Sequence, residues 1–192
     1  KSTGPLTCPP PWDSQVFLTI LEKVEDFLDA KIEPFGGNYF RVKIPHIIHN
    51  DIPKDNHNII PGKSIVIPLE KKYKENVEPK DNDAEFYVFD QMFFHAPVKC
   101  FKGGPKMESP WNIPLYEYDD IYGMHEDNRT PEGNFRHLVK KKWLEGFSIE
   151  KSCNWKPNDL IIFDCARLHC ASEFNKNNIV EKTGLSIFTS FR

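Results

Sequence analysis

Apolar residues in the first thirty positions recur every three or four residues, and the spacing becomes alternating soon afterwards. A period of about 3.6 residues is typical of a helix that buries one face. Asp13 or Ser14 is placed to cap the start of this helix, and the pair Gly36-Gly37 is expected to end it. The pattern predicts a helix over about 13–30 that lies on a sheet through Val16, Phe17, Ile20, Leu21, Val24, Phe27 and Leu28.

The later apolar segments are short and are separated by proline, glycine, asparagine and aspartate, as strands usually are. Strands and helices do not alternate regularly, and the strands lie far apart in sequence, which favours two packed antiparallel sheets over a parallel α/β sheet. We therefore predict a mostly β chain with flanking helices, folded as a jelly roll, a double-stranded β-helix of the cupin-like kind. The predicted strands are 39–44, 64–69, 85–91, 159–164 and 183–191.

The segment 97–150 has a different character, with a glycine pair, several prolines and aromatic residues among acidic ones. A stretch of this length without clear periodicity is typical of a functional lid or insertion, although packing over a sheet edge explains it equally. Because no repeat or flexible linker occurs elsewhere, we interpret 1–192 as a single domain that carries this insertion or lid. Its aromatic residues are candidates for lining a small-molecule pocket: Trp111, Tyr116, Tyr118 and Tyr122.

Charge and composition narrow the function. The 192 residues are 39% hydrophobic and 28% charged with a formal net charge of -3, so the chain is globular and offers no broad basic face for nucleic acid. No apolar run reaches the roughly 20 residues that span a bilayer, and the start is polar and broken by prolines, so we expect a cytoplasmic protein without a membrane partner. The five cysteines are odd in number and lack C-x-x-C spacing, which indicates reduced thiols.

One polar cluster follows the first predicted strand. His49 and Asp51 are two residues apart, so in a strand they point to the same face, whereas His46 is expected on the opposite face. Two histidines and one carboxylate on one side of a metal are typical of non-haem iron, so a third ligand is needed. His169 is the best candidate because the apolar strand 159–164 carries it towards the core, whereas His57, His125 and His137 have polar surroundings and His95 alone shares an apolar one.

These residues resemble the 2-oxoglutarate- and Fe(II)-dependent oxygenase superfamily. In that family an H-x-D motif ends an early jelly-roll strand, and a distal histidine follows a strand of the type G-D-hydrophobic-hydrophobic-F-D; here these are His49-Asn50-Asp51 and 158–164 before His169. The resemblance covers about 38–191 without the insertion. It implies Fe(II) held by His49, Asp51 and His169, with 2-oxoglutarate as co-substrate and O2.

The resemblance also implies a cation for the far carboxylate of 2-oxoglutarate, usually Arg or Lys on the strand after the distal histidine. Lys182 fills this place and shares a strand face with Gly184. Many family members have Ser or Thr two positions after the cation, so Gly184 departs from the pattern. Tyr39 or Thr183 is a candidate to supply a hydroxyl instead, and Arg41 is a candidate to face a substrate.

The activity implied is hydroxylation of a small-molecule or protein substrate with release of succinate and CO2. In the related halogenases the carboxylate ligand is missing so that a halide can bind, and Asp51 therefore favours hydroxylation or desaturation. Two other functions stay open: a cupin-like metal enzyme without 2-oxoglutarate, although the H-x-H motif of cupins is absent, and a non-catalytic jelly-roll binding module. A small molecule is the expected partner, and the pattern does not predict an oligomeric state.

Overall fold

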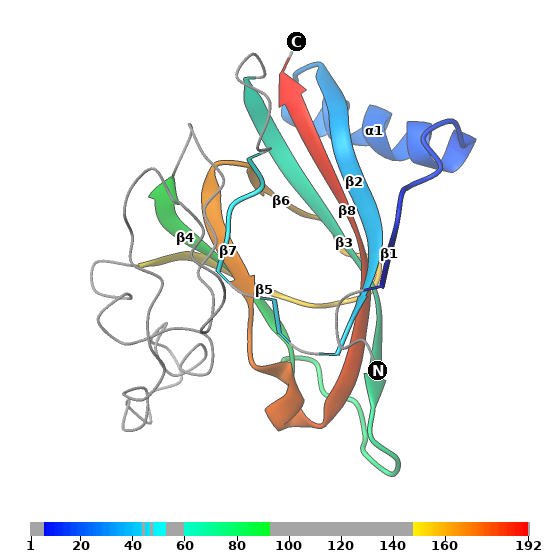
Figure 1. Ribbon diagram of the computed structural model, residues 1–192, viewed down its shortest axis with the longest axis vertical. Helices are drawn as coiled ribbons and strands as arrows, with labels where there is room; N and C mark the ends of the chain where they lie inside the picture. The colour runs from blue at the N-terminus through cyan, green and yellow to red at the C-terminus, as the bar shows by residue number, and fades with distance from the viewer. Residues whose placement is uncertain (1–5, 44, 47, 53–59, 93–147, 192) are drawn as a thin grey trace.

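Two antiparallel sheets face each other in the computed structural model, which describes residues 6–43, 45–46, 48–52, 60–92 and 148–191 (Figure 1). Nearly all the regular structure is strand, with one α-helix and one short 3-10 helix among these residues. The elements are β1 (Leu6–Cys8), α1 (Gln15–Leu28), β2 (Ile32–Val42), β3 (Pro61–Tyr73), β4 (Glu85–Met92), β5 (Ile149–Asn154), β6 (Ile161–Asp164), β7 (Arg167–Ala171), η2 (Phe174–Asn177) and β8 (Ile179–Phe191).

The strand order identifies the architecture. The larger sheet runs β1-β2-β8-β3-β6 and the smaller one β5-β4-β7, so the chain crosses between the two sheets repeatedly. A bridge between His49 and His169 attaches the segment before β3 to β7, which extends the smaller sheet beyond β7. The described chain is therefore a double-stranded β-helix, and the predicted jelly roll is confirmed.

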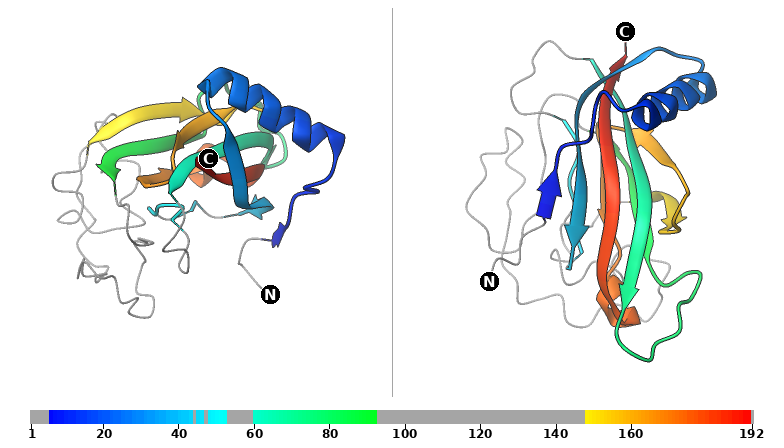
Figure 2. Two further views of the ribbon diagram at one scale, coloured as in Figure 1. Left: turned by 90° about the horizontal axis from the view of Figure 1, so that it is seen from above. Right: turned by 90° about the vertical axis from the view of Figure 1, so that its right-hand side faces the viewer.

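The helix α1 lies on the outer face of the larger sheet, away from the smaller one (Figures 1 and 2). The Ser14 hydroxyl caps it by accepting a hydrogen bond from the Phe17 amide at 3.2 Å. Phe17 and Val24 are buried, in a cluster that includes Ile65, Leu185 and Ile187 of the sheet. The predicted helix and its place on a sheet are confirmed, but two of the residues assigned to its buried face, Val16 and Phe27, are 73% and 77% exposed.

The predicted end of the helix at Gly36-Gly37 is wrong. The helix ends at Leu28, where Asp29 takes a left-handed conformation, and both glycines lie inside β2. A β-carbon on Gly37 would come within 2.6 Å of the Ser186 carbonyl oxygen, so glycine permits a close approach of β2 to β8 here. Both strands begin earlier than predicted, β2 at Ile32 and β8 at Ile179.

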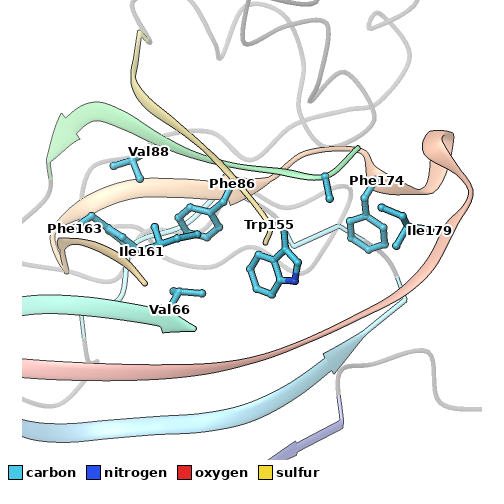
Figure 3. Packing of buried hydrophobic residues seen from close by; sticks show 9 residues of the cluster. Val66, Phe86, Val88, Trp155, Ile161, Phe163, Phe174 and Ile179 are labelled. Carbon is cyan, nitrogen blue, oxygen red and sulfur yellow. The ribbon is translucent and has the colours of Figure 1, made fainter. Parts of the chain in front are cut away.

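The inner core fills the space between the sheets (Figure 3). Trp155 is central to it, with Phe86 on one side and Phe174 on the other in the view shown. Trp155 is 2% exposed, and its backbone amide donates to the Ala84 carbonyl at 2.8 Å, which holds its main chain beside the residue that precedes β4. The other buried members are Val66, Ala84, Val88, Ile161, Phe163 and Ile179.

Most of the predicted insertion 97–150 lies outside the described residues, including its aromatic residues and two histidines, His125 and His137. His57 and His95, which precede the insertion, also lie outside them. At its end, β5 begins at Ile149 and pairs with β4, so the last two positions belong to the smaller sheet. In the described part of the chain, no helix is long and apolar enough to cross a membrane.

Candidate metal centre

The structure brings His49, Asp51 and His169 together. One ligand atom from each side chain lies within 4.8 Å of those of the other two. The Nε2 atom of His49 is 3.6 Å from Asp51 Oδ1, and that of His169 is 3.4 Å from Asp51 Oδ2. All three side chains are nearly inaccessible to solvent, at 9%, 7% and 3% exposure for His49, Asp51 and His169.

Backbone hydrogen bonds hold these ligands in register across 120 residues of sequence (169 minus 49). The His49 amide donates to the His169 carbonyl at 3.1 Å, and the His169 amide donates back to the His49 carbonyl at 2.8 Å. The Asp51 amide donates to the Cys165 carbonyl at 2.9 Å, just before β7. The triad is thus positioned by the main chain as well as by side-chain packing.

Neighbouring groups prepare the ligands for a metal. His169 Nδ1 is 3.1 Å from the Arg167 carbonyl oxygen, a contact that requires Nδ1–H as donor and leaves the Nε2 lone pair facing Asp51. Burial lowers the pKa of His169 to about 3, so the imidazole is neutral, as a ligand must be. The Ser64 hydroxyl donates to Asp51 Oδ2 at 2.7 Å and orients the carboxylate. Two imidazoles and one oriented carboxylate fit a divalent iron ion.

His46 does not point away from the cluster, contrary to the prediction. Its ring centroid lies 4.1 Å from that of His49. The residue is exposed, but it lines a cavity that His49, Asp51 and His169 also line. Strand alternation does not apply because the described residues between β2 and β3 form only the isolated bridge at His49.

A cavity of about 160 Å³ connects this triad with Lys182. Its walls are mostly apolar and come from both sheets, including Val42, Val66 and Phe86. His169 packs on Phe163 with ring centroids 4.5 Å apart, whereas Lys182 lies over Phe174 at 4.9 Å. Phe163 and Phe174 lie on opposite sides of the core cluster in Figure 3, so His169 and the lysine occupy different ends of the cavity.

Lys182 is only 1% exposed, and its Nζ atom has no hydrogen-bond partner among the residues described. It lies 4.0 Å from the centroid of the Trp155 ring, a distance typical of a cation–π contact. Burial lowers the pKa of this ammonium from 10.5 to about 7. The cavity therefore ends in a cation without a counter-ion in the described chain.

Tyr39 and Thr183 do not line the cavity, and the expectation that they supply a hydroxyl to it is not met. Tyr39 packs in the cluster under α1 because it pairs with Leu185, which faces outwards. Thr183 alternates with Lys182 and so takes the outer face as well. Arg41 also turns from the cavity and forms an ion pair with Glu181 at 3.5 Å.

Sequence reasoning missed two residues of this site. Ser64 belongs to no recognisable motif. It does lie in a predicted strand, and strand alternation could have placed its side chain on the inner face of the sheet. Trp155 was not singled out from the sequence, and its side chain reaches the cavity through packing that no spacing rule predicts.

No protein-family model matches this sequence, and no curated protein matches it. Among solved structures, the chain is similar to EvdO2 from Micromonospora carbonacea var. aurantiaca complexed with 2-oxoglutarate, with a TM-score of 0.48 and 14% identity over 96% of this chain and 66% of that one. It is also similar to a second crystal structure of EvdO2 from the same organism, with a TM-score of 0.43 and 15% identity over 97% of this chain and 67% of the other. The chain thus spans about two thirds of the length of these EvdO2 chains.

Proposed function

We propose that this chain is a 2-oxoglutarate- and Fe(II)-dependent oxygenase that hydroxylates a small molecule or a protein side chain with release of succinate and CO2. The observation that carries the proposal is a cavity with a His-Asp-His cluster and an uncompensated buried lysine in one wall. 2-Oxoglutarate has the matching form, a chelating 2-oxo acid at one end and a carboxylate at the other. The carbon chain of 2-oxoglutarate would lie along the apolar walls between the His-Asp-His cluster and Lys182.

His49, Asp51 and His169 would hold the iron, which when bound supplies the activation of O2 that is coupled to oxidative decarboxylation of the co-substrate. The chain's own residues bind, orient and protect. His169 stays neutral because it is buried, and Ser64 keeps one oxygen of Asp51 in place. A three-residue ligand set leaves positions for the 2-oxo acid and for O2.

Lys182 would donate charge-assisted hydrogen bonds to the far carboxylate of 2-oxoglutarate. Such an ion pair forms in a cavity with mostly apolar walls, where its attraction is stronger than in water. The apolar walls also exclude water from the metal. Asp51 fills the position that a halide would need, which favours oxygen transfer or desaturation over halogenation.

Anaerobic titration of the apoprotein with Fe(II) and then with 2-oxoglutarate tests the proposal. Bidentate binding of the 2-oxo acid to iron gives a weak visible charge-transfer band, which we expect in the wild type. The variants His49→Ala and His169→Ala should lose the band, and Asp51→Ala should lose iron-supported turnover.

His46→Ala is the matched control, because this histidine adjoins His49 but is not assigned as a ligand. It should keep the band, and its loss there would contradict the ligand assignment. Iron binding without the band would replace the proposal with a cupin-like enzyme that does not use 2-oxoglutarate. A wild type that binds no iron would leave a non-catalytic binding module.

A further inference from the structure

Two buried donors in the described chain have no hydrogen-bond partner and line the same cavity, Lys182 Nζ and Trp155 Nε1. An unpaired buried donor is costly, and native structures rarely keep one without a reason. Two such donors side by side indicate a ligand that accepts from both. We propose that Trp155 is a second donor to the far carboxylate of the co-substrate, an inference that rests on the proposed function.

The two donors are adjacent. The Lys182 ammonium lies over the Trp155 ring, 4.0 Å from its centroid, so both residues border the same part of the cavity. Figure 3 shows the indole nitrogen on the side of the ring that is turned from Phe86 towards Phe174. Phe174 is also the aromatic residue over which the ammonium lies, at 4.9 Å. The N–H group is therefore at the end of the cavity that holds the lysine.

Gly184 makes the space that the indole occupies. A β-carbon at this position would lie 2.9 Å from both Cη2 and Cζ2 of Trp155, and 2.6 Å from Cζ of Phe40. Any side chain at residue 184 would therefore displace the ring. The indole thus occupies the space beside Gly184, next to Lys182 in the cavity wall.

The chemistry of the two donors selects the ligand. Neither an ammonium nor an indole N–H can accept a hydrogen bond, so both match a group that only accepts, such as an ionised carboxylate. Lys71, the cross-strand partner of Lys182, is already neutralised by Asp83 at 2.6 Å. A single positive charge is left over among these side chains, which fits one carboxylate.

The test compares 2-oxoglutarate with 2-oxopentanoate, which has the same carbon chain but ends in a methyl group. Both are titrated anaerobically into the Fe(II)-loaded wild type and the variant Trp155→Phe, with the charge-transfer band as readout. We expect the variant to bind 2-oxoglutarate about 10- to 100-fold more weakly, as for loss of a hydrogen bond to a charged group. Its affinity for 2-oxopentanoate should stay within about twofold of the wild type, because that ligand has no acceptor for the indole.

Equal weakening of both ligands would overturn the assignment, because it would show that Trp155 acts through packing alone. Unchanged affinity for both would overturn it as well. If Trp155→Phe does not fold, incorporation of 3-benzothienylalanine decides the question, since it keeps the shape of the indole and replaces only the N–H group. A wild type that binds neither ligand, or does not prefer 2-oxoglutarate, would instead refute the proposed function itself.

Discussion

Replacing Lys182 with methionine should make the ligand-free protein more stable and at the same time disable co-substrate binding. The pKa of the buried ammonium falls from 10.5 to about 7, which corresponds to roughly 5 kcal/mol at neutral pH. The cation–π contact with Trp155 offsets about 2 kcal/mol of this cost. Methionine fills a similar volume without charge, so Lys182→Met should raise the free energy of unfolding by about 3 kcal/mol.

This gain should depend on pH. Between pH 7 and 10.5 the unfolded lysine keeps its proton while the folded one has lost it, so the stability of the wild type rises with pH in this window. The methionine variant lacks this contribution, while all other groups titrate alike in both proteins. The stability difference between the two should therefore be largest at pH 7 and below, and should shrink towards pH 10.

Urea denaturation of the two apoproteins at pH 7 and pH 9.5, followed by circular dichroism, measures both effects. Anaerobic titration of the same variant should show 2-oxoglutarate bound about 10- to 150-fold more weakly, because a charge-assisted hydrogen bond is lost. A variant that is no more stable than the wild type at pH 7 would refute the reasoning, since the lysine would then not be buried uncompensated. Unchanged affinity for 2-oxoglutarate would remove Lys182 from the co-substrate site.

Two further substitutions test the support of the site. Ser64→Ala removes the hydroxyl that donates to Asp51 at 2.7 Å, and it should weaken Fe(II) binding about 10- to 100-fold with little change in fold; unchanged iron affinity would show that the carboxylate needs no such support. Gly184→Ala places a methyl group against Trp155 and should cost about 1–3 kcal/mol in the free energy of unfolding. Gly36→Ala is its control, because a β-carbon there meets only a Phe188 ring atom at 3.3 Å, and equal losses in the two variants would contradict the packing argument.

The architecture and the meeting of the His-Asp-His cluster could be predicted because each has a signal in the local sequence. His49 and Asp51 are close in sequence, and His169 follows an apolar strand that leads into the core. The backbone bridge between His49 and His169, rather than strand alternation, brings the three side chains together. The same alternation that puts Lys182 inside excludes Thr183, so that error was avoidable from the sequence. His46 was placed wrongly because the segment before β3 is not a regular strand.

The far end of the cavity could not be predicted in the same way. Trp155 follows β5, Phe174 lies in η2 and Lys182 in β8, and only the folded chain puts the ammonium 4.0 Å from the centroid of the Trp155 ring. The exposure of Phe27 was equally beyond the pattern, because the helical period does not say how wide a stripe the sheet covers. The prediction for Tyr39 was wrong because the sequence does not give the register of β2 against β8. In the structure Tyr39 pairs with Leu185, which places it on the outer face.

The position of β8 has a consequence for how the fold forms. It is the last described strand in the sequence, yet it lies between β2 and β3 and pairs Ile32 with Phe191. During synthesis, the edges of β2 and β3 that pair with β8 therefore stay unpaired until β8 has been made. Pairing between strands that lie so far apart in sequence is slow. A chain interrupted before Ile179 would lose the middle of its larger sheet, and we expect it to aggregate through those edges.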